Sequence, residues 1–328
     1  MSEHRPPTEH GIAAITAGGA DLVAEIHGAK AVGLQQLLRL GLPVPPAIVI
    51  PVDLATELAV SAASGLLAEG RDDLGVALAG LEPARHGVSV RSGAAISLPG
   101  VFATVLHVPA TVAAVIAAVA DVEASTRGPQ VEPIVAALGL EEVPPTAVIV
   151  QVMVDGGADD RSGAGVATSR DPVTGEPGPA GSVAWSTSGA AVMQGSVPVR
   201  PLAELADRVP EAAARLTADL ARLDEELGQP VEVEFTVEAG RLWYLQLRTH
   251  EPPAAASDPG EPPAGELLAE GRPASAGIGV GLLFVDVDAA LERIDAGDEV
   301  VVALETSSPG EITVKVGAAA VLTVLGSP

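Results

Sequence analysis

The sequence contains no cysteine, few aromatic residues and no long apolar run, and each absence excludes a class of protein. The lack of cysteine excludes disulfides, thiolate catalysis and cysteine-based zinc sites. Aromatic residues make up 2% of the chain, so its cores are aliphatic and offer few stacking surfaces for bases or sugars. Glycine, proline or charge interrupts every apolar run before it reaches membrane-spanning length. Residues 1–10 are polar and lack the apolar centre of a signal peptide, so we expect a cytoplasmic protein.

Basic residues are also scarce: 18 lysines and arginines stand against 43 acidic residues, a formal net charge of −25. Nucleic acids and anionic membranes both require a basic surface, so we expect neither as a partner. Lys30 and Lys315 are the only two lysines. Arginine replaces lysine easily on a solvated surface, but less easily at a tight phosphate site that needs a compact ammonium. Lys30 is therefore a candidate for such a site. Chance retention is the alternative, and we favour it for Lys315.

The 328 residues, 48% of them hydrophobic, suffice for about two or three domains with buried cores. Apolar runs of strand length mix with longer stretches of helical spacing, which indicates an α/β (α+β) fold. Gly41, followed by prolines, is expected to end the first helix. Strands are expected at residues 47–50, 88–92, 147–154, 165–168, 231–237 and 242–247, and helices at 31–40, 53–82, 109–140 and 201–228. The apolar run at 147–154 is typical of a strand buried on both faces.

Residues 251–264 are rich in proline and alanine, the composition of a semi-extended linker. We therefore expect a tail at 1–19, a main domain at 20–250, a linker at 251–265 and a further domain at 266–328. The last segment is expected to hold a glycine-rich strand at 274–285, a short helix near 289–294, and strands near residues 300 and 320.

Two polar pairs stand on the predicted hairpin of residues 231–247 and its immediate continuation. Glu232 and Glu234 are two apart and point to the same face, as do Gln246 and Arg248 on the partner strand. Carboxylate and amide oxygens suit Mg²⁺, and a nearby arginine suits phosphate oxygens. The alternative is a solvated sheet face with cross-strand ion pairs.

Two more cations stand at the ends of predicted elements. Lys30 follows Gly28 just before a helix, an arrangement that favours anion binding, although an ordinary helix start explains it equally well. Arg91 ends a predicted strand beside Ser92, and there too anion binding and an ordinary structural position are both possible explanations. The six histidines show no metal-ligand spacing, and His27 is interpreted as a surface residue at a helix start. The glycines at 163 and 165 precede a strand and a turn, which excludes a dinucleotide fingerprint.

Five segments, in this order and spacing, resemble the ATP-binding domain of the pyruvate, phosphate dikinase and phosphoenolpyruvate synthase family, over most of residues 20–250. They are Gly28-Ala29-Lys30 with the Leu40–Pro46 run, Val90–Val101, Val150–Val154 with Ser162–Pro172, Glu232–Thr236, and Leu245–Thr249. The resemblance implies an ATP-grasp fold of two subdomains and the cofactors ATP and Mg²⁺. It also implies a set of site residues. Lys30 and Arg91 would contact ATP phosphates, Gln151 would join the nucleotide site, Glu234 and Gln246 would hold Mg²⁺ with support from Glu232, and Arg248 would meet the transferring phosphates. Lys30 and Arg248 would be the catalytic pair.

The chain also departs from the family's pattern. Gly181-Ser182 and Ser188-Gly189-Ala190-Ala191 stand where the family has a Gly-Glu pair and a Gln-Gly-Glu-Asp run. Alanines replace glycines at positions 29 and 31. Residues 271–277, 305–312 and 320–323 resemble the start of the family's swivelling phosphohistidine domain. No histidine lies beyond His250 in this sequence, and we expect the module to lack the family's pyruvate-binding barrel.

Three interpretations follow. In the first, the chain is an ATP-dependent phosphotransferase module, incomplete alone, that passes phosphate to a separate histidine-bearing phosphoacceptor protein. In the second, it is a catalytically silent ATP-binding regulatory or partner-binding module. In the third, it is a truncated paralogue without a function of its own. We favour the first.

Overall fold

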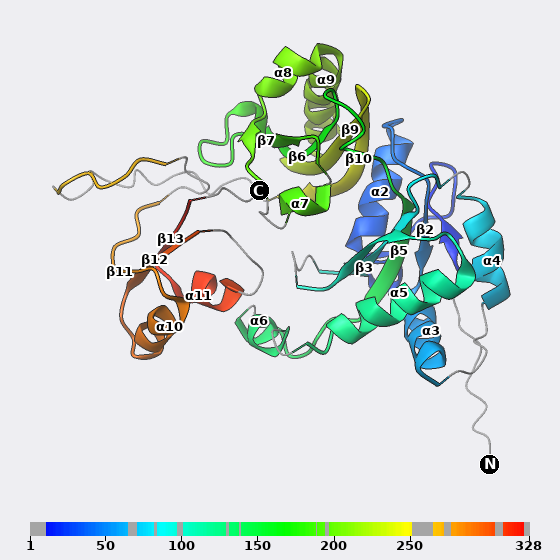
Figure 1. Ribbon diagram of the computed structural model, residues 1–328, viewed down its shortest axis with the longest axis horizontal. Helices are drawn as coiled ribbons and strands as arrows, with labels where there is room; N and C mark the ends of the chain where they lie inside the picture. Colours follow the sequence, from blue (N-terminus) through cyan, green and yellow to red (C-terminus); the bar gives the residue numbers. More distant parts are fainter. Residues whose placement is uncertain are drawn as a thin grey trace. The chain divides into compact units, whose positions relative to one another are not determined.

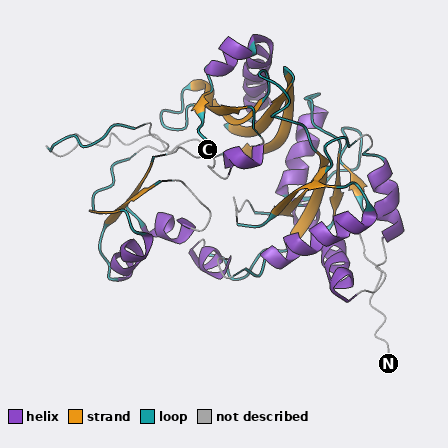
Figure 2. Ribbon diagram, in the orientation of Figure 1, coloured by secondary structure: helices purple, strands orange, loops and turns teal. Residues whose placement is uncertain are grey.

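The computed structural model describes residues 11–64, 71–81, 84–96, 101–128, 131–137, 139–187, 189–193, 197–250, 265–271, 277–305 and 311–324. The chain divides into two units: the first comprises 1–154 with 243–246, and the second comprises 155–242 with 247–328. Figure 1 traces the chain through both, and Figure 2 shows that strands and helices mix in each. The expected first ten tail residues and the linker at 251–264 lie outside the described residues, and the domain boundaries stay predictions.

The first unit is built on a five-stranded sheet in the order β1-β2-β5-β3-β4, with neighbouring strands antiparallel. Its strands are β1 (Ala13–Ala14), β2 (Ala47–Ile50), β3 (Val88–Ala94), β4 (Thr104–Val108) and β5 (Thr146–Val152). Its helices are α1 (Ala24–His27), α2 (Ala29–Arg39), α3 (Val52–Ser64), α4 (Arg71–Ala79), α5 (Val112–Ser125) and α6 (Val131–Ala137). The buried strand expected at 147–154 is confirmed as β5, although its sheet is antiparallel.

The two faces of this sheet have different roles. Ile48, Val90 and Val150 point into one core with the buried sides of α3, α4 and α5. Because side chains alternate along a strand, Arg91 and Gln151 lie on the opposite face. The start of α2 comes against β3 at Gly93, on that opposite face. Alternation therefore separates the packing residues from the candidate binding residues.

Helix ends in this unit follow local sequence signals. Gly41 has a φ of 73° and its N–H donates to the carbonyl of Leu38, which confirms the predicted end of α2. The expected helix at 53–82 is two helices, α3 and α4, and that at 109–140 is also two, α5 and α6. Glycine or proline stands in each intervening sequence, and both lower helix propensity.

The second unit contains a five-stranded sheet in the order β10-β9-β6-β7-β8. Its strands are β6 (Gly163–Arg170), β7 (Pro177–Trp185), β8 (Arg200–Pro201), β9 (Val231–Glu238) and β10 (Arg241–Thr249). Its helices are α7 (Gly189–Met193), α8 (Glu204–Arg208) and α9 (Pro210–Leu227). The single helix expected at 201–228 is divided because Pro210 begins α9, the position a helix tolerates proline best.

The predicted hairpin is confirmed as β9 and β10. Its loop is Ala239-Gly240, with φ values of 48° and 84°. Positive φ at both loop residues is the geometry of a two-residue turn whose twist matches the strands it joins. The middle of β10, residues 243–246, is grouped with the first unit, so this strand belongs to both.

The C-terminal residues form a three-stranded sheet of β11 (Leu282–Phe284), β12 (Val300–Leu304) and β13 (Ala320–Thr323), paired in parallel. Helices α10 (Val287–Asp295) and α11 (Ile312–Gly317) pack on it around Val302 and Val314. The expected helix and the strands near 300 and 320 are confirmed. The strand expected at 274–285 is shorter, and residues 272–276 lie outside the described part. The described part of the chain is thus mixed α/β, with two antiparallel sheets and one parallel sheet, compatible with the α+β expectation.

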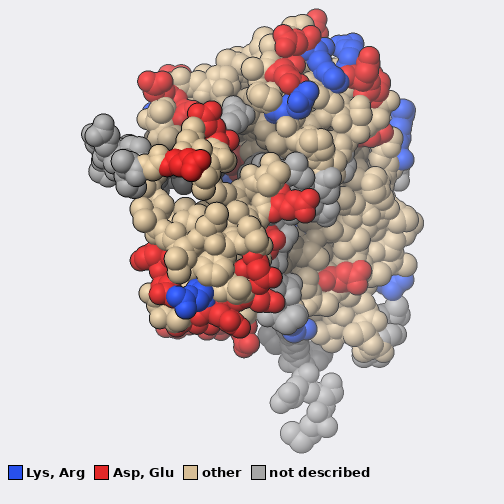
Figure 3. Space-filling view, turned by 60° about the vertical axis from the view of Figure 1, so that its left-hand side comes forward, with Lys and Arg blue, Asp and Glu red and all other residues tan. Residues whose placement is uncertain are grey.

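None of the helices in the described ranges is long and apolar enough to cross a membrane. On the face drawn in Figure 3, acidic side chains are spread widely and basic ones gather in a few places. This distribution accompanies the formal net charge of −25.

Candidate functional site

Lys30 is held at the start of α2 by a close approach of two glycines. Gly28 precedes α2 with a φ of 81°, and a Cβ on it would overlap the carbonyl oxygen of Gly93 in β3. This contact brings the first turn of α2 against β3. The Nζ of Lys30 donates to the main-chain oxygen of Ser92 at 3.0 Å. The ammonium group therefore lies beside the strand that carries Arg91.

Arg91 is half-buried and donates to three oxygens within the first unit. Its Nη2 lies 2.6 Å from the Oε1 of Gln246, and its Nη1 lies 3.2 Å from the carbonyl oxygen of Leu245. A longer contact of 3.5 Å joins Nη1 to the Oε1 of Gln151. Gln151 and Gln246 are each 2% exposed. The structure therefore brings three predicted residues together around one guanidinium.

A second cluster joins the strands β9 and β10 in the second unit. Arg248 lies 3.3 Å from a carboxylate oxygen of Glu232 and 3.6 Å from one of Glu234. The three side chains are 20%, 20% and 13% exposed, so the face is largely shielded rather than solvated. His250 Nε2 lies 3.6 Å from the other Glu232 oxygen. The predicted convergence of two carboxylates and an arginine is present in this geometry.

The donors of this cluster suit a magnesium ion that is shared with phosphates. Among the described residues, no group of three or more histidine or acidic side chains could hold a metal ion alone. Mg²⁺ is commonly bound by one or two carboxylates together with substrate phosphates, and Glu232 with Glu234 supply that number. The buried Nε of Arg248 has no hydrogen-bond partner in the described part of the protein, which leaves a donor for a further acceptor. The side chains of this cluster therefore fit a magnesium ion that also binds phosphate oxygens.

Gln246 differs from its predicted environment. From the sequence, its amide oxygen was predicted to bind Mg²⁺ together with the carboxylates of the hairpin. In the structure its Oε1 accepts the short hydrogen bond from Arg91, a residue 155 positions earlier in the chain. Such a long-range pair leaves no local signal in the sequence.

The interpretation of His27 as a surface residue was wrong, because it is 9% exposed. Its Nδ1 accepts from the backbone N–H of Val23 at 3.1 Å. The imidazole thus closes the short helix α1 onto its own first turn, a local side-chain-to-backbone bond. His27 is therefore a buried residue that directly precedes Gly28, and it is not a solvent-exposed residue at a helix start.

One strong polar contact was missed by sequence reasoning. Asp224 on α9 accepts from Arg170 Nε at 2.9 Å and Nη2 at 2.7 Å, and from the hydroxyl of Ser169 at 2.6 Å. The hydrogen bond from Arg170 holds the pKa of Asp224 below its ordinary value, with Ser169 acting in the same direction and burial opposing. The ion pair raises the pKa of Arg170. Ser169 and Arg170 therefore tie the end of β6 to α9.

The two departures from the family's acidic pattern lie in β7 and at α7. Gly181 has a φ of 137°, and a Cβ there would overlap the carbonyl oxygen of Val166. Ser182 is half-buried in the same strand. Gly189 begins α7, whereas Ser188 lies outside the described residues.

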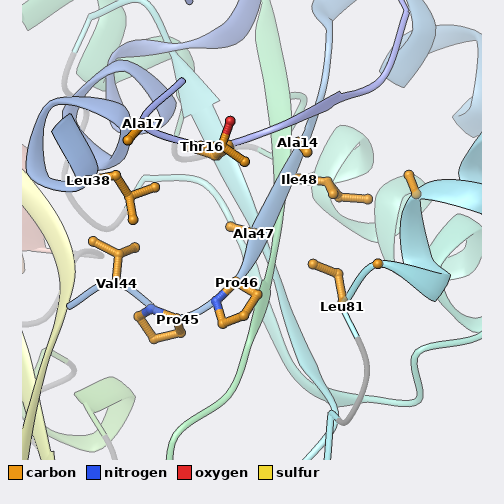
Figure 4. Close-up of a pocket in the computed structure, with 13 residues that line it drawn as sticks. Ala14, Thr16, Ala17, Leu38, Val44, Pro45, Pro46, Ala47, Ile48 and Leu81 are labelled. Atoms are coloured by element: carbon orange, nitrogen blue, oxygen red, sulfur yellow. The ribbon is translucent and has the colours of Figure 1, made fainter. Parts of the chain in front are cut away.

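A separate pocket of about 320 Å³ lies in the first unit. Figure 4 shows Leu38, Val44, Pro46, Ile48 and Leu81 around it. Its lining carries no ionisable side chain, so it offers no charged side chain for phosphate or metal. The polar residues named above are not part of this lining.

No protein-family model matches the chain. Pyruvate, phosphate dikinase from Clostridium symbiosum is 27% identical over 216 residues, 55% of this chain and 25% of that protein. The chloroplastic pyruvate, phosphate dikinase 1 of Oryza sativa subsp. japonica is 30% identical over 217 residues, 55% of this chain and 23% of that protein. Pyruvate, phosphate dikinase 2 of the same plant is 38% identical over 104 residues, 32% of this chain and 12% of that protein. The chain thus spans a quarter or less of the length of these relatives. The resemblance inferred from the five segments is confirmed: the chain is related to the pyruvate, phosphate dikinases.

Proposed function

We propose that the chain is a dikinase-type phosphotransferase module with an ATP-grasp fold, and that it binds Mg²⁺ and ATP. The observation that carries this proposal is the Arg248 cluster, in which one guanidinium lies within 4 Å of two carboxylates and all three side chains are shielded from solvent. Such a cluster offers both metal ligands and a phosphate ligand on neighbouring strands.

The phosphate-binding part of the proposal rests on three cations. Lys30 and Arg91 would contact the ATP phosphates, and Arg248 would meet the phosphates in transfer. Phosphoryl transfer requires positioning and charge neutralisation more than covalent chemistry, and fixed cations supply both. Gln151 contributes by contacting Arg91, because its Oε1 is one of the acceptors around that guanidinium.

The metal-binding part rests on Glu234 and Glu232. They would hold Mg²⁺ through carboxylate oxygens, and the resemblance adds Gln246 as a neutral oxygen ligand. When bound, the ion would neutralise charge on the phosphate oxygens. Arg248, paired with both carboxylates, would then turn its charge towards the phosphates.

The phosphate acceptor would be a histidine on a separate phosphoacceptor protein. The second candidate is a silent ATP-binding module. The alanines at 190 and 191, where the family has acidic residues, favour that reading.

Calorimetric titration of Mg-ATP tests the binding proposal. Lys30→Ala and Glu234→Ala should each weaken binding at least about tenfold, since a hydrogen bond to a charged group contributes roughly 1.5–3 kcal/mol. Lys315→Ala is the matched control, because Lys315 pairs with Glu311 in the C-terminal part, and it should bind like the wild type. Absence of binding by the wild type would overturn both candidates.

A transfer assay separates the two candidates. The protein is incubated with phosphate-labelled ATP and with histidine-bearing proteins encoded nearby, and acid-labile label on the partner is measured. Label that depends on Lys30 and Arg248 supports the phosphotransferase. Binding without label on any partner supports the silent module.

A further inference from the structure

Two consecutive residues of β10 provide both main acceptors of the Arg91 guanidinium. The Oε1 of Gln246 accepts a hydrogen bond from Arg91 Nη2 at 2.6 Å, and the carbonyl oxygen of Leu245 accepts one from Arg91 Nη1 at 3.2 Å. The preceding residue, Tyr244, donates its N–H to the carbonyl of Pro43 at 2.8 Å. All of these residues belong to the first unit. The segment is therefore anchored, and it presents a fixed pair of acceptors to the guanidinium.

A fixed pair of acceptors matters for an arginine. Its side chain is long and loses much rotamer freedom when it is ordered, whereas its planar fork is easily aligned by two acceptors. Arg91 lies in the middle of β3 (Val88–Ala94) rather than at a strand end as expected from the sequence, and its long side chain could take several directions from the sheet face if no acceptor bound it. Two bonds to separate nitrogens fix both the position and the plane of the group.

We infer that Gln246 is a positioning residue for Arg91 and serves phosphate binding through that guanidinium, rather than as a direct magnesium ligand. This inference rests on the proposed function and changes the role that the resemblance gives to Gln246. It makes the pair of Gln246 and Arg91 one functional unit, with Gln151 as a weaker third member.

Electrostatics favours this assignment over metal ligation. The Oε1 of Gln246 already accepts a short, charge-assisted hydrogen bond. A magnesium ion would need to sit about 2.0–2.1 Å from the same oxygen. It would then face a guanidinium bound to that oxygen, and like charges at such distances repel strongly in a site shielded from water. Gln246 is 2% exposed, so water does little to screen this repulsion.

The nucleotide arm of the test compares Gln246→Leu with Gln246→Glu in calorimetric titrations. Positioning predicts that the leucine variant binds Mg-ATP at least about fivefold more weakly while the Mg²⁺ concentration for half-saturation stays within twofold. The glutamate variant keeps an acceptor for Arg91 and retains affinity. In an Arg91→Ala background, the leucine substitution should have almost no further effect, because the group that it positions is gone.

Metal ligation predicts a different result, and that result would overturn the inference. The leucine variant would raise the Mg²⁺ requirement tenfold or more, the glutamate variant would lower it, and both effects would persist without Arg91. Circular dichroism melts check that each variant is folded, and the glutamate variant keeps the test open if the leucine variant is not.

A second arm uses the free protein and separates this inference from the proposed function. NMR of arginine side chains should show slow exchange of the Arg91 Nη hydrogens in the wild type and at least tenfold faster exchange in Gln246→Leu. Unchanged exchange would overturn the pairing even if Mg-ATP binds. Slow exchange in a wild type that binds no Mg-ATP would overturn the proposed function and, with it, the positioning role.

Discussion

Gly28 and Gly93 meet backbone to backbone, so closely that a Cβ on Gly28 would overlap the carbonyl oxygen of Gly93. Gly28 also has a φ of 81°, which disfavours any side chain. The contact allows α2 to begin against β3, and Lys30 reaches Ser92 from there. In the Gly-Ala-Lys segment, the glycine is therefore required for steric reasons, whereas the lysine contributes its charged ammonium group.

Gly28→Ala should destabilise the protein and weaken Mg-ATP binding. With a φ of 81° and a ψ of 148°, Gly28 lies in a backbone region that is essentially restricted to glycine, where strain costs about 1–3 kcal/mol, and the overlap with Gly93 adds to it. Gly41→Ala is the control, since Gly41 has a φ of 73° but nothing within 4 Å of its added Cβ. Urea unfolding should show a larger loss for Gly28→Ala than for Gly41→Ala. Equal losses would mean that the close approach has no energetic weight.

Ala239→Gly should stabilise the protein by about 1 kcal/mol. Ala239 occupies the first position of the β9–β10 turn with a φ of 48°, and an alanine in that region carries a strain that glycine does not. The control is Ala218→Gly at an exposed position of α9, where the same substitution should cost about 1 kcal/mol. Thermal unfolding should move in opposite directions for the two variants. A lower melting temperature for Ala239→Gly would contradict the turn geometry.

Local patterns in the sequence predicted local structure well. The end of α2 at Gly41, the hairpin of β9 and β10, and the buried strand β5 each depend on residues within one element. The strands β1, β4, β7 and β8 were not predicted. The sequence of β7, Pro177–Trp185, is rich in glycine and proline, which have low β-propensity, so it forms a strand through its pairing with the neighbouring strands β6 and β8.

Long-range pairing was the part that the sequence could not supply. Glu232, Glu234 and Arg248 were grouped correctly because alternation along a hairpin places them on one face. Gln246 follows the same alternation, yet its Oε1 bonds to Arg91 from β3. Which partner an amide takes depends on the order of strands in space, and that order is set by the packing of whole elements rather than by any local spacing.

Glu123→Gln should stabilise the protein at neutral pH by about 0.5–1 kcal/mol, the usual scale of a favourable single substitution. Glu123 on α5 is 7% exposed, and burial raises the pKa of its carboxyl, with Arg127 opposing. A raised pKa means that burial penalises the charged form, so the cost is present above the folded pKa and disappears as the pH falls. Asp121→Asn, exposed on the same helix, is the control and should change little. Destabilisation by Glu123→Gln at pH 7 would contradict the burial argument.

Asp224→Asn should destabilise the protein by about 1–2 kcal/mol at neutral pH, because it removes the charge from the contacts with Arg170 and Ser169. The pKa of Asp224 is below its ordinary value of 3.8, chiefly because of the hydrogen bond from Arg170. A carboxyl with a lowered folded pKa contributes stability that is fully present above 3.8 and is lost as the pH falls through the folded pKa. The difference in unfolding free energy between wild type and Asp224→Asn should therefore be constant from about pH 5 to 7 and shrink towards about pH 3. Glu225→Gln, the exposed neighbour on α9, serves as the control in the same urea titrations. A difference that grows on acidification would show that the carboxylate of Asp224 is not held in its charged form by Arg170.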